Sequence, residues 1–105
     1  MILSTMETIE GRRIEETFGL VRGNTIRARH VGRDIMAGLR TIVGGEIKDY
    51  TRMLDQARDQ AIQRMVTQAE SLGANAILGV RFTTSQTMQA AAEILAYGTA
   101  VRLNE

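Results

Sequence analysis

One long amphipathic helix, predicted between Asp49 and Gly73, limits most strongly how this chain can fold. Asp49 is a suitable N-cap, and Gly73 ends the helical pattern. Over about six turns the apolar residues recur on one face. These residues are Tyr50, Met53, Leu54, Ala57, Ala61, Met65, Ala69 and Leu72. The opposite face is polar, so the helix needs one other layer to pack against.

Strand-like segments on both sides of this helix supply that layer. They are Met1–Met6, Ile14–Arg29, Asn75–Thr84 and Ala92–Leu103. Gly23-Asn24 is a turn or bulge signal, so Ile14–Arg29 is either two short strands or one bent strand. Ser85–Gln89 is predicted to be a turn. In the last strand one alternating set is small around Gly98, which indicates the close approach of a helix or another backbone.

A shorter helix is predicted from Val31, because Ile35, Met36, Leu39, Ile42 and Val43 recur at helical spacing. Gly44-Gly45 ends it. The predicted fold is therefore α+β, a two-layer β-β-α-α-β-β subunit with an antiparallel sheet packed by the long helix. One helix covers one face of such a sheet. The other face and the edges remain to be covered, and we expect oligomerisation to cover them.

Composition excludes several classes of protein. A chain of 105 residues is expected to be one domain, residues 1–105. With no Cys it cannot build a disulfide scaffold, an iron–sulfur cluster or a thiol nucleophile, and its single His excludes paired imidazoles within one subunit. A net charge of +1 and 4% aromatic residues argue against nucleic acid and acidic membranes as partners. No signal peptide or membrane span is evident, and we expect a cytoplasmic protein.

Two groups of residues could carry chemistry. His30 and Asp34 lie four residues apart, as in a partial metal site, but two ligands do not make a site, and the favoured interpretation of His30 is a surface or strand-end histidine without a ligand. Five arginines could gather on one surface and bind an anion. They are Arg22, Arg27, Arg29, Arg33 and Arg40. Their alternative role is ion pairing with the acidic residues Glu15, Glu16, Asp34 or Asp49. No spacing forces carboxylates or serines into a catalytic arrangement.

Several stretches together resemble one family. They are Arg33–Arg40, Ile42–Gly45, Tyr50 with Leu54, Ala57-Arg58 and Ala61, Gly73–Val80, and Gly98–Val101. In this order they resemble the YbjQ-like family of small bacterial and archaeal proteins, which carries a heavy-metal-binding label and has no settled biochemical role. The resemblance implies a dodecin-like subunit. It also implies a homopentamer, alone or stacked into a decamer, whose strands join between subunits.

The chain departs from the family pattern where a metal would matter. Acidic residues that members commonly carry after the Gly-Val step are replaced here by Arg81–Ser85. Arg29 and His30 replace an otherwise small, apolar stretch. These departures weaken the metal interpretation and favour an anion-binding or interface role for the arginines.

Three functions follow, in order of preference. The first is a non-enzymatic homo-oligomer that binds a small ligand or a partner at subunit junctions, without a cofactor, through the residues where the family motif is densest. These residues are Arg33, Asp34, Arg40, Gly44 and Gly45. The second is a heavy-metal-binding protein in which His30 and Asp34, repeated by symmetry, hold a divalent ion. The third is an enzyme acting on an anionic metabolite.

Overall fold

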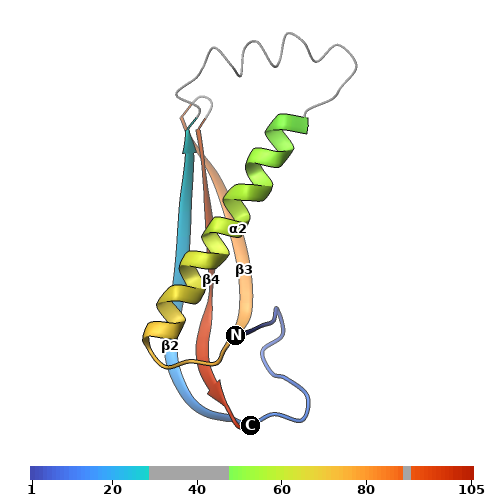
Figure 1. The fold of residues 1–105 in the computed structure, drawn as a ribbon, viewed down its shortest axis with the longest axis vertical. Coiled ribbons are helices and arrows are strands. Elements are labelled where there is room, and N and C mark those ends of the chain that lie inside the picture. The colour runs from blue at the N-terminus through green and yellow to red at the C-terminus, as the bar shows by residue number, and fades with distance from the viewer. Residues whose placement is uncertain (29–47, 89–90) are drawn as a thin grey trace.

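A four-stranded sheet crossed on one face by a helix makes up the described part of this α+β protein (Figure 1). The structure, a computed structural model, describes residues 1–28, 48–88 and 91–105. Its elements are β1 (Ile2–Leu3), β2 (Ile14–Ala28), α2 (Lys48–Ser71), β3 (Ala76–Met88) and β4 (Ala91–Leu103). The strands lie in the order β1-β3-β4-β2, so β4 is central and the outer side of β2 forms one edge.

The helix α2 confirms the main sequence prediction. It begins at Lys48, one residue before the predicted cap, and ends at Ser71. Gly73 follows with a φ of 90°, a left-handed conformation that glycine adopts without strain. The residues that α2 buries completely are spaced by four: Ala57, Ala61, Met65 and Ala69. Three of these four are alanines, so the helix axis can approach the sheet closely.

Small residues in the sheet permit this close approach. On β4 the predicted alternating set faces the helix, and its members Ala96 and Ala100 are fully buried. On β2 the contact is closer still. A Cβ added at Gly23 would lie 2.2 Å from the carbonyl oxygen of Ala61 and 2.4 Å from the nitrogen of Met65. Glycine is therefore required at this crossing, a role that its turn-like sequence context did not reveal.

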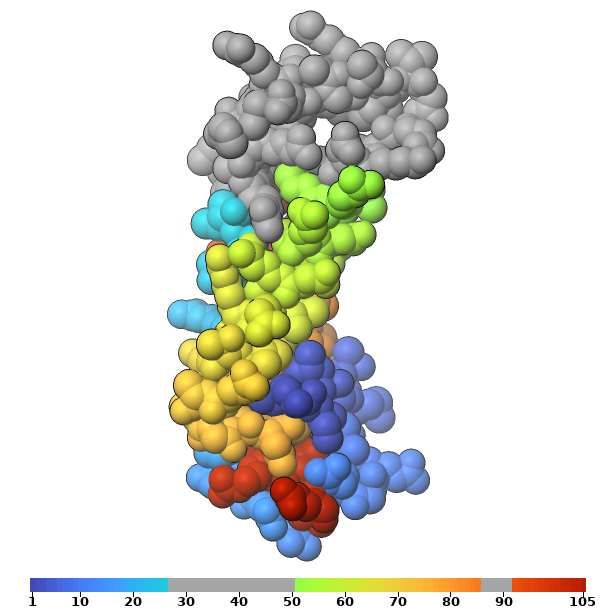
Figure 2. Space-filling model, in the orientation of Figure 1, coloured from blue at the N-terminus to red at the C-terminus, as the bar shows by residue number. Residues whose placement is uncertain are grey.

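Among the described residues, the opposite face of the sheet is covered only at one end. There a second cluster of buried residues, Ala76, Leu78, Val101 and Leu103, packs against Ile2 and Ile9 of the N-terminal segment. The N-terminal segment, the end of α2 and the C-terminus gather at this end of the molecule (Figure 2). Farther along the strands no described residue packs over this face, which we call the open face.

Two sequence predictions about the sheet are wrong. The sheet is mixed rather than antiparallel, because β1 pairs with β3 in parallel through Ile2↔Ala76 and Leu3↔Ile77. Of the two alternatives predicted for Ile14–Arg29, the structure shows a single strand: β2 continues through Gly23 and Asn24, and its register shifts lie nearer its start, between Ile14 and Gly19. The predicted turn begins too early, since β3 continues to Met88. The shorter predicted helix lies outside the described residues. No helix in the described ranges is long and apolar enough to cross a membrane.

Candidate functional site

The residues in which the sequence concentrates the candidate site lie outside the described part of the chain. They are His30, Arg33, Asp34, Arg40, Gly44 and Gly45. The described segments that flank them are the end of β2 at Ala28 and the start of α2 at Lys48. Both lie at the end of the molecule opposite the two termini, as do the end of β3 and the start of β4 (Figure 1). The described structure therefore bears on function through its sheet faces and edges.

The open face combines exposed apolar side chains with arginine. Residues of β2 alternate, so Val21, Gly23 and Thr25 lie buried under α2 while the side chains between them point to the open face. Leu20 and Ile26 are 69% and 58% exposed there. Between them, Tyr97 and Leu95 on β4 are half-buried and pair with Arg22 and Asn24 of β2. An apolar strip of this kind on a sheet is typical of an interaction surface.

Two arginines flank this strip. Arg22 on β2 and Arg81 on β3 both pair with Tyr97 of β4, so the three residues form one row across the sheet. The Arg81 guanidinium donates hydrogen bonds at 2.9 Å to the carbonyl oxygens of Thr5 and Val80. Arg81 therefore fastens the N-terminal segment to β3. The side chain of Arg22 is exposed, so its guanidinium is accessible to solvent.

Two of the four acidic residues predicted as partners of the arginine group, Glu15 and Glu16, are paired with other arginines. Glu15 forms an ion pair with Arg13 at 3.5 Å, and Glu16 forms one with Arg102. The Arg102 guanidinium also lies over the ring of Phe18, 5.6 Å from its centroid. These exposed pairs stabilise the sheet end near the termini, and they leave Arg22 unmatched by Glu15 or Glu16.

Metal-binding residues do not come together in the described ranges. Within residues 1–28, 48–88 and 91–105 no three His, Cys, Asp or Glu side chains form a group that could hold a metal ion. Met65, which the sequence places on the apolar face of the long helix, is fully buried in the core. His30 and Asp34, the residues predicted to hold a metal, lie outside these ranges.

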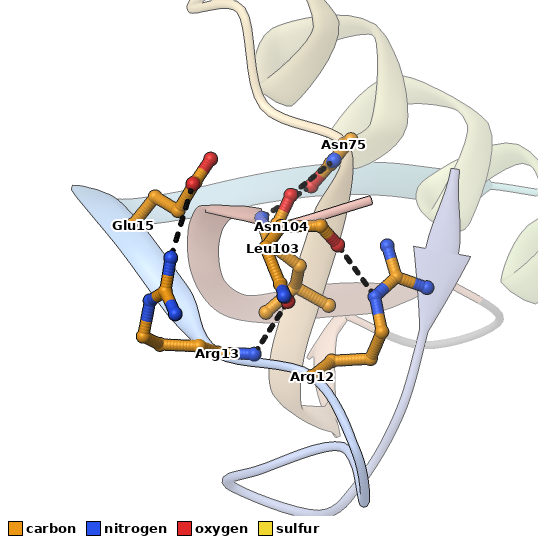
Figure 3. A network of polar contacts seen from close by, with 6 residues as sticks. All are labelled: Arg12, Arg13, Glu15, Asn75, Leu103 and Asn104. Atoms are coloured by element: carbon orange, nitrogen blue, oxygen red, sulfur yellow. Dashed lines mark hydrogen bonds and ion pairs between the residues drawn. The ribbon is translucent and has the colours of Figure 1, made fainter.

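A polar network fastens the C-terminal residues Leu103 and Asn104 to Arg12, Arg13 and Asn75 (Figure 3). The side chain of Asn75 pairs with the backbone of Leu103 on both sides: Nδ2 donates to the carbonyl oxygen at 3.0 Å, and Oδ1 accepts from the amide at 2.7 Å. Arg12 Nε donates to the carbonyl oxygen of Asn104 at 2.6 Å, and the amide of Arg13 donates to Asn104 Oδ1 at 2.7 Å. The Asn75 side chain thus makes the two hydrogen bonds to Leu103 that the backbone of a neighbouring strand would make, just before β3 begins at Ala76.

Sequence reasoning missed this network. Asn75 was assigned to a strand, and Asn104 was not considered. One sequence feature points to this network: Asn75 directly precedes a buried apolar strand, and Asn side chains readily form hydrogen bonds to nearby backbone. The pairing partner lies in a strand distant in sequence, so no local pattern identifies it.

Asn75→Ala is expected to lower the free energy of unfolding by about 1–3 kcal/mol, because the part-buried amide and carbonyl of Leu103 lose their partners. Asn75→Asp keeps the acceptor but places a carboxylate against the Leu103 carbonyl, so it should also destabilise. Urea unfolding measures both variants. Equal stability of Asn75→Ala and wild type would show that the network contributes nothing.

Comparison with known proteins adds the family. The family described as "Putative heavy-metal-binding" matches residues 1–104. A UPF0145 protein of Archaeoglobus fulgidus is 60% identical over 103 residues, covering 98% of this chain and 95% of the relative. A UPF0145 protein of Psychromonas ingrahamii is 58% identical over 105 residues, covering 100% of both chains. The names of these relatives state no biochemical activity.

A solved structure agrees in fold. The crystal structure of a protein of unknown function from Pediococcus pentosaceus, assigned to the DUF74 family, aligns with a TM-score of 0.69 at 21% identity. The alignment covers 99% of this chain and 98% of that one. Because the match spans nearly the whole chain and relatives are about 60% identical, the chain belongs to the YbjQ-like family of uncharacterised proteins.

Proposed function

We propose that this protein is a homo-oligomer, a ring of five subunits, that binds a small ligand or a partner at the subunit junctions and catalyses no reaction. One observation carries the proposal: the open face presents Leu20 and Ile26 to solvent on a sheet whose other face α2 already covers. Exposed apolar side chains that form a strip on a sheet favour contact with another protein surface. A second copy of the same chain supplies such a surface through symmetry.

The binding part of the proposal rests on Arg33, Asp34, Arg40 and Gly44-Gly45. In the sequence these residues directly follow β2 and precede α2. A ring repeats each of them around its axis, so residues that are too few in one chain become several at a junction. Arginine suits such a junction because its planar guanidinium forms paired hydrogen bonds to carboxylate or phosphate. The absence of Cys and the single His support a binding role over catalysis.

Leu20→Arg tests the assembly. The substitution places a charge in the apolar strip of the open face, which an oligomer would have to bury, so we expect the mass at micromolar concentration to fall toward 11.6 kDa. Light scattering after size exclusion measures the mass. Leu72→Arg is the matched control, because Leu72 is also exposed, at 45%, but follows α2. If both variants keep the wild-type mass, the open face is not the contact.

Heavy-metal binding is the second candidate, favoured by the description of the family. In a ring, His30 and Asp34 from several subunits could together supply enough ligands for a divalent ion. Calorimetric titration of wild type and His30→Ala with zinc, nickel and copper tests this candidate. Binding that His30→Ala weakens at least about tenfold supports it. Titrations that the substitution leaves unchanged exclude His30 as a ligand.

A further inference from the structure

Arg22 lies between exposed apolar residues on the open face. The β2 side chains that alternate to this face are Leu20, Arg22, Asn24 and Ile26, and all four are exposed. Successive residues on one face of a strand are about 7 Å apart. A surface that covers Leu20 and Ile26, as the proposed function requires, therefore covers the side chain of Arg22 as well.

The backbone on both sides of this position is fixed by the helix. The amide of Arg22 donates to Gln68 Oε1 at 2.8 Å, and Arg64 Nη1 donates to the carbonyl oxygen of Asn24 at 2.6 Å. These bonds hold the middle of β2 against α2, so the Arg22 side chain stays directed to the open face. A substitution of that side chain leaves the backbone bond to Gln68 in place.

Hydrogen-bond donors surround Arg22 on the open face. Arg22 pairs with Tyr97 of β4, and Tyr97 pairs with Arg81 of β3. Residues directly opposite each other have Cβ atoms about 5 Å apart, so the two arginine Cβ atoms lie about 10 Å apart across the tyrosine. Thr99, two residues along β4, adds an exposed hydroxyl on the same face. Arg81 donates to the carbonyls of Thr5 and Val80, which leave its positive charge unneutralised.

Acidic side chains in the described strands are directed elsewhere. Glu93 is the acidic residue of β4, and β3 contains none. Glu93 lies four residues from Tyr97, about 13 Å along the strand, and accepts a hydrogen bond from Asn24 Nδ2 at 3.3 Å. The acids of β2, Glu15 and Glu16, form ion pairs with Arg13 and Arg102. The described residues therefore leave an uncompensated positive charge in the middle of the open face.

A guanidinium in this position needs an anion once the face is covered. Burying a charge without a partner is strongly unfavourable, whereas a hydrogen-bonded counter-ion offsets the loss of water. The planar guanidinium of Arg22 can form paired hydrogen bonds to the oxygens of a phosphate or a carboxylate. The hydroxyls of Tyr97 and Thr99 can donate to the same group.

We propose that the open face binds a small oxyanion, a phosphate or a carboxylate, through Arg22, with Tyr97 and Thr99 as further donors. Arg81 adds positive charge across the row. The site uses described residues of the sheet rather than Arg33 and its neighbours. It rests on the proposed function in taking the open face as the place where copies meet, and it names the chemical class of the ligand held there.

Calorimetric titration with inorganic phosphate and with succinate tests the site, in a buffer of low ionic strength that contains neither kind of ion. We expect the wild-type protein to bind at least one of them saturably. Arg22→Gln should weaken that binding at least about tenfold, because the charged hydrogen-bond partner is lost. Tighter binding of phosphate supports a phosphorylated ligand, and tighter binding of succinate supports a carboxylate.

Arg58→Gln is the matched control. It removes one exposed guanidinium from α2, where Arg58 pairs with Asp55 at 2.8 Å, and changes the net charge by the same amount as Arg22→Gln. Binding to this variant should stay within about twofold of wild type, because salt screens charges that are distant from the ligand. Equal weakening by both substitutions would show attraction to net charge alone and would overturn the site.

Light scattering of the same samples separates this inference from the proposed assembly. An oligomer that binds neither ion, or whose binding Arg22→Gln leaves unchanged, overturns the oxyanion site and leaves the assembly intact. A monomer whose binding depends on Arg22 supports the site and contradicts the assembly. A monomer that binds neither ion contradicts both.

Discussion

Gly23→Ala is expected to lower the free energy of unfolding by about 3 kcal/mol or more, at the upper end of the cost of overpacking. The new Cβ would lie 2.2 Å from the Ala61 carbonyl oxygen, 2.4 Å from the Met65 nitrogen and 2.9 Å from the Arg64 Cβ. Two of these atoms are helix backbone, which cannot turn aside as a side chain can. The helix must therefore move off the sheet, and the small buried residues along it lose contact together.

Urea unfolding at one fixed protein concentration measures this effect, since an oligomer's stability depends on concentration. Gly23→Val should destabilise further than Gly23→Ala because it adds two more carbons at the same contact. Gln63→Ala, on the exposed side of α2, is the control and should remain within about 0.5 kcal/mol of wild type. A Gly23→Ala protein with the wild-type midpoint would mean that α2 does not cross β2 at this position.

The second large effect is expected from Met65→Ala, which should cost about 2–5 kcal/mol. Met65 is fully buried and is the largest side chain that α2 places in the core. The buried residues one turn before and after it on the helix, Ala61 and Ala69, are too short to fill the cavity left behind. The loss combines the lower burial of apolar surface with the cost of that cavity.

Met6→Ala is the matched control for this prediction. The same side chain is removed at a position that is 64% exposed, so stability should change by less than about 0.5 kcal/mol. The Met6 carbonyl keeps its hydrogen bond from Gly79, because the bond involves backbone alone. Equal losses from the two substitutions would contradict the assignment of Met65 to the core.

The sequence predicts well the elements whose pattern is local. The spacing of Ala57, Ala61, Met65 and Ala69 by four is a property of one segment, and the structure confirms the helix it predicts. The alternation in β4 is similarly local, and the small set around Gly98 lies on the predicted close-packed face. In both cases the period of the side chains determines which face is buried.

Features that join distant segments could not be predicted in this way. The parallel pairing of β1 with β3 depends on where the N-terminal segment returns to the sheet. Asn75 pairs with Leu103, and Gln68 with the edge of β2, across 28 and 46 residues. The extension of β3 to Met88 was hidden by its polar sequence, which pairs with β4. Tertiary pairing stabilises that polar segment as a strand, although its composition resembles a turn.

For the candidate site, the sequence predicts that one sheet face needs covering, but the local pattern does not predict the hydrogen bonds between α2 and β2. The expectation that one helix leaves a sheet face to be covered is consistent with the open face and its exposed Leu20 and Ile26. The residues of the proposed ligand site, including His30 and Arg33, lie outside the described residues. The hydrogen bonds that join Gln68 and Arg64 of α2 to the backbone of Arg22 and Asn24 have no counterpart in the sequence pattern, because they link side chains of one element to the backbone of another.

The mass of the wild-type protein in solution tests the proposed assembly most directly. Light scattering coupled to size exclusion, over a range of micromolar concentrations, measures it independently of molecular shape. A ring predicts five times the 11.6 kDa mass of one chain, or ten times if two rings stack. A mass of 11.6 kDa throughout that range would contradict the proposal and would leave the open face without a partner of its own kind.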